Sequence, residues 1–449
     1  MKINDLAELE ITAIGCNMEG IAKHGDIVTF VPYADVGERV SARIVHVSKS
    51  YAFAEECGIL RASAYRRKPP CEHFGKCGGC DCQHLTYERQ TEHKERILKD
   101  TLAKFFDISD ITFLPIKHGE NQLHYRNKLQ MPISQGRDGA IIGFFEKDSH
   151  RAVDIDNCPL HGGWAETVIK CVRQYAEACR ISAYDERSHK GILRHIVARN
   201  VCGHTSVLMV INARELPKYS ALIDILEYSI QDFSLHISVN TKQTNVILGD
   251  NIKTLYGNPR AQCQAFGIKA DISPLSFMQV NDEVRDIIYA DVMSCVKSSE
   301  VIIDAYSGGG LLTALLARNA DKVYGIEIVK EAVSDADRLM KDNGITNAEN
   351  LLGDTAELLP PLIDKLKCES AQSITVVLDP PRKGCDKKVI DALLKAIPKG
   401  IVYVSCNPAT LARDLAYLNA RYDIKTVTPY DMFPNTRHIE TLVSLSLRP

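Results

Sequence analysis

The sequence predicts an α/β protein in three parts: a small β-barrel, a mixed α+β central domain and a doubly wound, Rossmann-like parallel sheet. Three observations lead to this prediction. Short strand-like stretches crowd the first sixty residues, strands surround one helical stretch in the middle, and strands and helices alternate regularly after residue 300. The length of 449 residues also corresponds to about three domains of ordinary size.

Composition indicates a folded, cytosolic protein. Apolar residues make up 45% of the chain and charged residues 25%, which excludes fibrous repeats and general disorder. The net charge of −3 gives no overall basic field, so a nucleic-acid partner would have to be held by local patches. No targeting segment or membrane-spanning run is recognisable, and a monomer is the default expectation.

The first two thirds of the chain contain short strands that are interrupted by one unusual segment. Alternating apolar positions predict a barrel, with strands at residues 9–14, 20–21, 26–31 and 38–47. Residues 61–90 are first basic, then proline-rich, then rich in cysteine and glycine. This change in composition indicates a domain boundary that contains a bound group. Helical spacing predicts helices at 86–106 and 164–179, with strands at 128–133, 141–145, 192–200, 206–211 and 245–248.

The last third gives the clearest pattern. Apolar runs that alternate with amphipathic stretches predict parallel strands joined by helices. We expect strands at 301–304, 322–326, 351–354, 374–379, 401–405 and 442–447, and helices at 311–318, 331–343, 386–396 and 411–418.

A glycine-rich turn after the first of these strands predicts a nucleotide-type site. Gly308 and Gly310 let the backbone approach a ligand, and Glu327, which ends the next strand, can bind ribose hydroxyls. The dinucleotide fingerprint would need a small residue where Thr313 stands, which favours S-adenosylmethionine over NAD. Asp379 begins a stiff acidic motif at the same sheet edge.

Cys406 stands directly after a buried strand and before a helix. A helix N-terminus stabilises a thiolate, so this position favours a nucleophile over a buried core cysteine. His438 and Glu440, in a His-Ile-Glu segment before the last strand, are a candidate acid/base pair for proton transfer.

Together these motifs resemble the RNA uracil-C5 methyltransferase family, a group of class I, S-adenosylmethionine-dependent enzymes. The segments are FMQVN at 277–281, DAYSG at 304–308, DPPRKG at 379–384, SCNP at 405–408 and HIE at 438–440. The resemblance implies that Cys406 is the nucleophile and Glu440 the general base. It also implies that the methyl donor is bound by Gln279, Tyr306, Glu327 and Asp379. Ser307 replaces a frequent family cysteine at a position without a catalytic role.

The chemistry requires both implied catalytic residues. Addition of a thiolate to C6 turns uracil into an enolate whose C5 can attack a methyl sulfonium, and a base must then remove the C5 hydrogen. The main alternative enzyme is an RNA or DNA cytosine-C5 methyltransferase, which uses the same thiolate, usually in a Pro-Cys or Thr-Cys context where this chain has Ser405-Cys406. The non-enzyme alternative is an RNA-binding iron-sulfur scaffold, against which the intact Cys406, Glu440 and Asp379 argue.

Cys71, Cys77 and Cys80 lie close together among glycines. Spacing alone favours a metal site, with zinc ahead of an iron-sulfur cluster. The segment GGCDCQHL at 78–85 is similar, however, to one that holds a 4Fe-4S cluster in family members acting on ribosomal RNA, and this implies Cys158 as the fourth ligand. Cys82 is then spare, and we expect His84 to form hydrogen bonds rather than bind metal.

The first sixty residues resemble a TRAM domain, an OB-like RNA-binding barrel, through MEGIA at 18–22, FVP at 30–32 and GERV at 37–40. Such barrels hold single strands by stacking and by charge. The segment HYRNK at 124–128 resembles a family segment near bound RNA. Candidate contacts are Phe30, Tyr33, Arg39, Arg43 and Tyr51 on the barrel, followed by Arg61, Arg66, Arg67 and Lys68.

The resemblance gives boundaries and a substrate class. We expect a TRAM barrel at 1–60, a central domain with an iron-sulfur site at 61–90 and 123–258, and the methyltransferase domain at 91–122 and 259–449. The barrel and the cysteines favour 23S ribosomal RNA over transfer RNA, with the target base flipped or unstacked.

Overall fold

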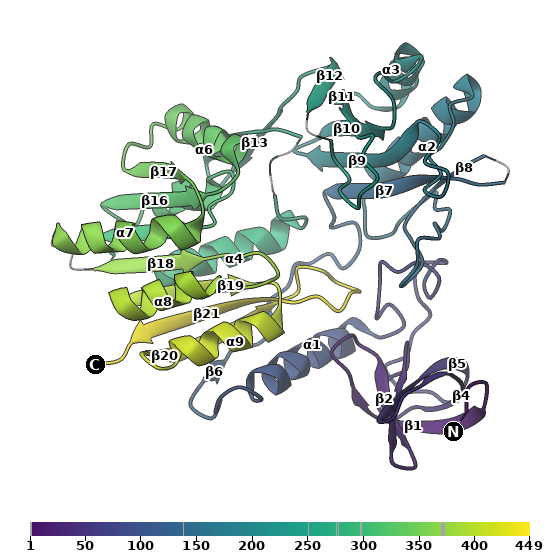
Figure 1. Cartoon of the computed structure of the whole chain (residues 1–449), viewed down its shortest axis with the longest axis horizontal. Helices are drawn as coiled ribbons and strands as arrows, with labels where there is room; N and C mark the ends of the chain where they lie inside the picture. The colour runs from purple at the N-terminus through teal and green to yellow at the C-terminus, as the bar shows by residue number, and fades with distance from the viewer. Residues whose placement is uncertain are drawn as a thin grey trace.

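The computed structural model describes residues 2–137, 139–249, 251–274, 276, 278–296, 299–369 and 373–449. They form a barrel near the N-terminus, a central sheet with two helices, and a larger sheet with helices on both faces (Figure 1). This confirms the predicted fold class. No helix in this part of the chain combines the length and the apolar character that a membrane crossing requires.

The N-terminal barrel is closed, with the strand order β1-β2-β3-β5-β4. Its strands alternate buried and exposed positions, as β1 shows with Ala7, Leu9 and Ile11 facing inward. Strand β5 was not predicted because its inward residues include the small Ala52 and Ala54, which give a weak apolar signal. The strands are β1 Leu6–Ile14, β2 Gly20–His24, β3 Ile27–Val31, β4 Arg39–Val47 and β5 Tyr51–Arg61.

The central domain is a mixed sheet with the order β12-β11-β10-β9-β7-β8. Helices α2 and α3 bury their apolar sides on this sheet, in a core that includes Leu129, Val168 and Leu222. Its elements are β7 Lys128–Gln135, β8 Ala140–Ile142, α2 Gly163–Cys179, β9 Leu193–Val201, β10 His204–Ile211, α3 Tyr219–Ser229, β11 Phe233–Val239 and β12 Ile252–Tyr256.

The strand expected at 245–248 is wrong, because those residues form a loop. The Asn240 side chain donates to the carbonyl oxygens of Val246 and Ile247, at 2.6 and 2.9 Å. Ile247 and Leu248 pack against Val197 and other residues of the sheet. The apolar side chains of this loop thus pack on the face of the sheet, and the loop backbone does not pair with a strand.

The C-terminal sheet has the order β17-β16-β15-β18-β19-β21-β20-β6. Its first five strands are parallel, as predicted, and β21 runs antiparallel to β19. The strands are β6 Thr112–Phe113, β15 Val301–Ala305, β16 Lys322–Glu327, β17 Ala348–Leu352, β18 Ile374–Leu378, β19 Gly400–Ser405, β20 Tyr422–Tyr430 and β21 Glu440–Leu447.

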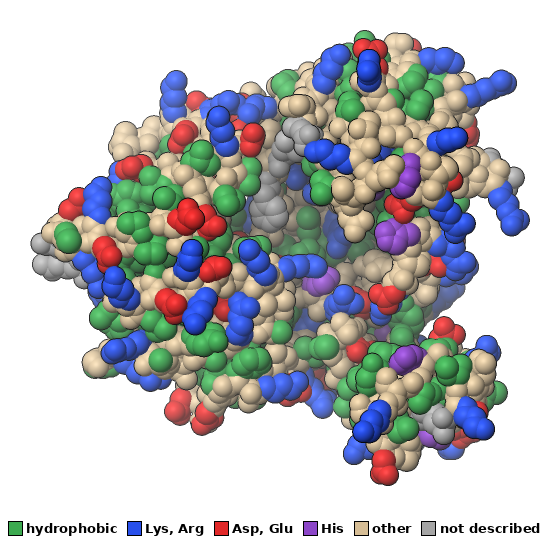
Figure 2. Space-filling model, viewed as in Figure 1, with side chains coloured by type: hydrophobic (Ala, Val, Ile, Leu, Met, Phe, Trp, Pro, Cys, Tyr) green, Lys and Arg blue, Asp and Glu red, His purple; other side chains and the backbone are tan. Residues whose placement is uncertain are grey.

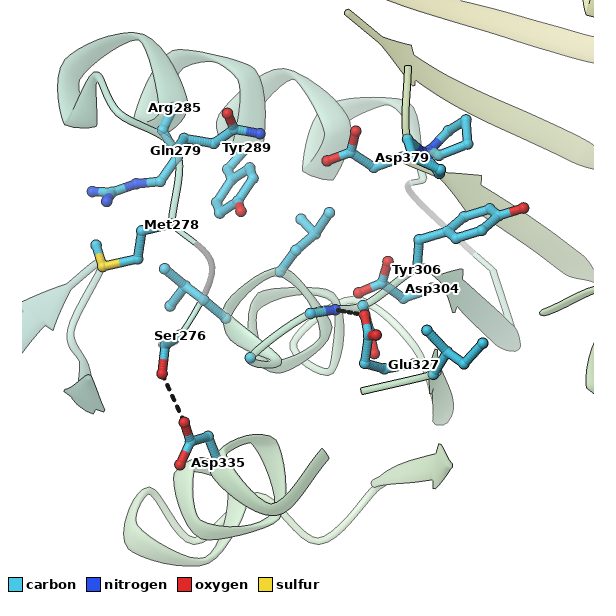
Figure 3. Close-up of a pocket in the computed structure, with 18 of the residues that line it drawn as sticks. Ser276, Met278, Gln279, Arg285, Tyr289, Asp304, Tyr306, Glu327, Asp335 and Asp379 are labelled. Carbon is cyan, nitrogen blue, oxygen red and sulfur yellow. Dashed lines mark hydrogen bonds between the residues drawn. The ribbon is translucent and has the colours of Figure 1, made fainter. Parts of the chain in front are cut away.

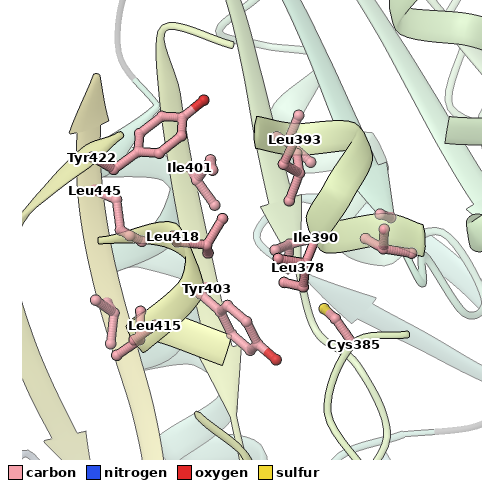
Figure 4. Close-up of a cluster of buried hydrophobic side chains, with 14 of the residues drawn as sticks. Leu378, Cys385, Ile390, Leu393, Ile401, Tyr403, Leu415, Leu418, Tyr422 and Leu445 are labelled. Atoms are coloured by element: carbon pink, nitrogen blue, oxygen red, sulfur yellow. The ribbon is translucent and has the colours of Figure 1, made fainter. Parts of the chain in front are cut away.

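Helices cover both faces of this sheet (Figure 1). One core contains the aromatic side chains of Tyr403 and Tyr422 among leucines and isoleucines (Figure 4), and the core on the other face includes Val292 and Leu316. The helices are α1 Tyr87–Leu102, α4 Asp282–Cys295, α5 Leu311–Leu316, α6 Lys330–Asp342, α7 Thr355–Cys368, α8 Lys387–Ala396 and α9 Pro408–Leu418. A hairpin of β13 Ala261–Ala265 and β14 Ile268–Ile272 precedes α4 and contacts α6.

Candidate active site and cysteine site

A cavity of about 630 Å³ opens where the parallel strands of the large sheet end. This is the edge where open α/β sheets bind their ligands. The cavity brings together every catalytic and cofactor-binding residue expected from the sequence: Gln279, Tyr306, Glu327, Asp379, Cys406 and Glu440. Phe277 of the same motif lies outside the described residues.

The glycine turn after β15 is shaped for close approach of a ligand. Gly308 and Gly310 have φ of 54° and 81°, and a Cβ on Gly310 would come within 2.6 Å of the Ala336 Cβ. The Gly308 N-H donates to Glu327 Oε2 at 3.0 Å, and the Val329 N-H donates to Oε1 at 2.8 Å. Figure 3 shows the bond to Gly308, which fixes the Glu327 carboxylate at the cavity wall.

Two further carboxyls lie in the wall of this cavity. Burial raises the pKa of Asp304 to about 6, although Thr313 donates a hydrogen bond to it at 2.6 Å. Burial and the neighbouring Asp304 raise the pKa of Asp379 to about 7. Figure 3 shows Asp304, Asp379 and Tyr306 on one side of the space and Gln279 and Tyr289 on another. A cationic ligand placed between them would favour the ionised carboxylates.

Strand register brings the expected nucleophile and base together. Ser405, the last residue of β19, pairs with Thr441 of β21. Continuing this antiparallel register by one residue sets Cys406 opposite Glu440. Two residues that are far apart in sequence therefore line the same end of the cavity, which no local pattern could reveal.

The surroundings of this pair oppose negative charge. Burial, followed by Glu440 and Asp379, raises the pKa of Cys406 to about 11. Burial and Asp379 raise the pKa of Glu440 well above its ordinary value. Arg382 acts in the opposite direction on both groups. Thiolate formation is thus disfavoured until positive charge enters the cavity.

Two further residues line the same end of the cavity: Arg382, to which sequence reasoning gave no role, and His438, which it paired with Glu440 as a candidate acid/base pair. Arg382 Nη2 and His438 Nε2 are 3.5 Å apart. The Arg382 carbonyl accepts from Asn407 Nδ2 at 3.1 Å and from Thr410 Oγ1 at 3.3 Å, which ties the Asp379 motif to the start of α9. Both residues belong to the motifs at 379–384 and 438–440. What the structure adds is that they lie in the same cavity as Cys406.

A second, smaller cavity of about 110 Å³ is lined by all four expected cysteine ligands, Cys71, Cys77, Cys80 and Cys158. Burial raises the pKa of Cys80 to about 12 and that of Cys158 to about 11. No Asp or Glu is among the described residues that line it. Arg126 does line it, and its Nε is enclosed without a hydrogen-bond partner in the described part of the chain.

The arrangement of these thiols differs from that of a single-ion site. Zinc binds sulfur at about 2.3 Å and therefore draws its ligands tightly together. Within the described ranges, no three His, Cys, Asp or Glu side chains meet closely enough to hold one metal ion. The thiols surround a space instead.

The two other residues of this segment lie apart from the cavity. Cys82 is buried against Met18 and Leu85, as expected for a spare thiol. The expectation that His84 forms side-chain hydrogen bonds is wrong, since neither ring nitrogen has a partner among the residues described. Its ring packs against Tyr33 and Phe74, with centroids 6.1 and 5.6 Å away, so it is a core residue.

Comparison with known proteins identifies the family. A family model described as tRNA (uracil-5-)-methyltransferase matches residues 86–448. The chain belongs to the tRNA (uracil-5-)-methyltransferase family. A TRAM domain model matches residues 4–55. The chain is thus an S-adenosylmethionine-dependent RNA methyltransferase with an N-terminal TRAM barrel.

Individual relatives agree with this family assignment. An uncharacterized RNA methyltransferase of Halalkalibacterium halodurans is 38% identical over 99% of this chain and 98% of its own length. One from Clostridium tetani is 37% identical over 99% and 97%. The solved structure of Pyrococcus abyssi tRNA (uracil-54, C5)-methyltransferase, in complex with S-adenosyl-L-homocysteine, matches with a TM-score of 0.78 and 27% identity. It covers 98% of this chain and 99% of its own.

On the TRAM barrel of this methyltransferase, the candidate RNA contacts separate into two groups. Phe30 and Tyr51 join Phe53 and His46 in a patch of neighbouring rings, and Tyr51 and Phe53 are 38% and 39% exposed. Arg43 and Lys68 are exposed. The other candidates already contact other residues of the chain. These contacts are Tyr33 with Phe74, Arg39 with Glu8, Arg61 with Glu10, Arg66 with Glu38, and Arg67 with Gln83 and Asn435.

The segment at 124–128 joins the parts of the methyltransferase. The Tyr125 hydroxyl donates to the Pro434 carbonyl at 3.1 Å, and Asn127 Nδ2 donates to the Gln279 carbonyl at 3.0 Å. Arg126 lies over the ring of Phe433, 5.9 Å from its centre. Arg126 lines the small cavity and Phe433 lines the large one, so this segment joins the walls of the two cavities.

Proposed function

We propose that the enzyme methylates C5 of a specific uridine in RNA, with Cys406 as nucleophile and Glu440 as general base. The observation that carries the proposal is the register of β19 and β21, which sets these two residues opposite each other at one end of the cavity. The other residues expected to bind the methyl donor, Gln279, Tyr306, Glu327 and Asp379, line the same cavity.

The proposed steps follow from these positions. The Cys406 thiolate adds to C6, and C5 of the resulting enolate takes the methyl group, which leaves S-adenosyl-L-homocysteine. The Glu440 carboxylate then removes the C5 proton, the C6-sulfur bond breaks, and 5-methyluridine and the free thiolate are released. The pKa values of Cys406 and Glu440 are raised, so the ionised forms of both groups are disfavoured. The positive charges of the sulfonium and of Arg382 stabilise these ionised forms.

We also propose that Cys71, Cys77, Cys80 and Cys158 hold a 4Fe-4S cluster. Such a cluster is larger than a single ion and is held by four thiolates, which agrees with four thiols around one cavity. The absence of carboxylates among the described lining residues and the enclosed Arg126 Nε suit an anionic group. The methyl transfer uses no electron from it, so its role would be structural.

We propose 23S ribosomal RNA as the substrate, on the resemblance of the cysteine segment alone. The barrel does not separate the two RNA classes, because a transfer-RNA enzyme from Pyrococcus abyssi matches 98% of this chain. That match makes transfer RNA the second candidate.

Nucleoside mass spectrometry tests the proposal. Undermodified 23S ribosomal RNA and transfer RNA are incubated separately with the enzyme and S-adenosylmethionine, and methylated fragments are mapped. 5-Methyluridine in ribosomal RNA alone is the expected result. 5-Methyluridine in transfer RNA would overturn the substrate class, and 5-methylcytidine would overturn the reaction.

A further inference from the structure

The loop at residues 431–439, between β20 and β21, forms part of the wall of the large cavity. It carries Phe433 and His438, which line the cavity beside Cys406, and it leads directly into Glu440. The two rings contact each other at 5.8 Å between centroids. The loop contains no helix or strand and extends from the sheet toward the start of α1 (Figure 1). Its position therefore depends on contacts with other segments.

Asn435 makes more of these contacts than any other residue of the loop. It is fully buried and has a φ of 69°, a conformation that Asn tolerates better than most residues. Its backbone N-H donates to Gln90 Oε1 at 3.0 Å, and its Nδ2 donates to the Gln122 carbonyl at 2.8 Å. Its Oδ1 accepts from Arg67 Nη2 and Gln90 Nε2, both at 3.2 Å.

The Asn435 carbonyl reaches the cysteine-bearing segment. It accepts from the backbone N-H groups of Asp81 and Cys82 at 3.1 and 3.3 Å. Asp81 returns the contact, because its Oδ2 accepts from the Arg437 N-H at 3.0 Å. Residues 81 and 82 thus hold the loop from two sides of Thr436.

The same short run touches the cysteine cavity. Gln83 Nε2 lies 3.1 Å from Cys80 Sγ, and Gln83 Oε1 accepts from the Cys71 N-H at 3.1 Å. Four consecutive residues, 80–83, therefore contact both the thiols and the loop. A displacement of this run would be transmitted to the cavity wall, since buried polar contacts are costly to leave unmade.

We propose that Asn435 is a positioning residue that couples the cysteine segment to the catalytic end of the large cavity. Its backbone carbonyl makes the contact with residues 81 and 82. Its carboxamide holds that carbonyl in place by using both its donor and its acceptor, which neither Asp nor Ala can do. The inference rests on the proposed function for its effect on the reaction, but the coupling itself does not.

Hydrogen-deuterium exchange of residues 431–439 tests the coupling directly. Asn435→Gly keeps the positive φ and removes the side-chain bonds, whereas Asp81→Ala removes the second contact, which is made by a side chain that is 11% exposed. We expect exchange in this loop to rise about tenfold or more in both variants, and to rise in Cys80→Ala. Asp81→Asn, which keeps an acceptor oxygen, should restore most of the protection. Asp423→Ala, which removes an exposed ion pair with Arg448, is the matched control.

Kinetics test the positioning role. In Asn435→Gly and Asp81→Ala we expect kcat to fall between about tenfold and a hundredfold. The Kd for S-adenosylmethionine should stay within about twofold of wild type, because Glu327 is held by the N-H groups of Gly308 and Val329 and not by the loop. Unchanged loop exchange in both variants would overturn the coupling. Increased exchange with wild-type kcat would overturn the positioning role. A wild-type enzyme that methylates no RNA would overturn the proposed function and leave the exchange result standing.

Discussion

The two cavities of this enzyme both contain half-buried cysteine thiols whose pKa is raised by burial, yet their surroundings differ. The large cavity sets the Cys406 thiol among carboxyls, including Asp304, Asp379 and Glu440. In the small cavity four thiols face Arg126, and none of the lining residues that the structure describes is acidic.

This difference indicates which ligand each cavity suits. A wall of carboxyls attracts a sulfonium or an amine, and the arriving cation in turn helps the neighbouring thiol to ionise. Thiols beside an arginine are instead suited to a soft, anionic metal cluster. Under the proposed function, the same side chain thus acts as nucleophile in one cavity and as ligand in the other, and the neighbouring charges differ accordingly.

Removal of the Cys406 thiol should have the largest effect. We expect Cys406→Ala to lower methyl transfer by roughly 10⁴-fold or more, and Glu440→Gln to lower turnover by about 10²- to 10⁴-fold. A denaturing gel should show methylated RNA covalently bound to Glu440→Gln and none bound to Cys406→Ala. Cys368→Ala, which changes an exposed thiol, is the control. Wild-type activity in Cys406→Ala would disprove the mechanism.

Removal of one thiol from the other cavity should change metal content instead. After anaerobic purification we expect iron and sulfide in the wild type, in Cys406→Ala and in Cys82→Ala, and their loss in Cys80→Ala. Cys82 is the matched control because it lies two residues from Cys80 but outside the cavity. Zinc without sulfide in the wild-type protein would disprove the cluster.

The sequence was sufficient for the parallel strands, and for Gly308, Glu327 and Cys406 at strand ends, because such positions have local signatures. Gln279, Tyr306 and Cys158 were expected only from the family resemblance. The sequence was insufficient where the structure depends on distant partners. Helix α7 was not predicted, because it contains Pro360 and Pro361 and prolines ordinarily signal a break in a helix. The pairing of Cys406 with Glu440 depends on strand register, and Asn435 has no local signature because its partners lie about 310 to 370 residues away in sequence.

The acidic character of the large cavity can be tested by pH. The pKa of Asp379 is raised to about 7, so this carboxyl takes up a proton as the pH falls through 7 and loses its attraction for a cation. The affinity for S-adenosylmethionine should therefore be full above pH 8 and fall by up to about tenfold per pH unit below 7. Calorimetry should show this dependence reduced in Asp379→Asn. Affinity that rises on acidification would contradict the assignment.

The smallest effect is expected outside both cavities, on the exposed rings of the barrel. Stacking of an RNA base on an aromatic ring is worth about 1–3 kcal/mol, and Tyr51 and Phe53 form adjacent exposed surfaces, 5.7 Å apart between centroids. In the double variant Tyr51→Ala/Phe53→Ala we expect KM for a long RNA to rise about fivefold to tenfold with kcat unchanged, because neither ring lines the catalytic cavity. A short oligonucleotide that carries only the target uridine should show no change. Val45→Ala, which alters another exposed apolar residue of the barrel, is the control. An equal effect on the short and the long RNA would mean that the rings act through the fold of the enzyme. RNA recognition would then have to lie within the two cavities and the segments between them.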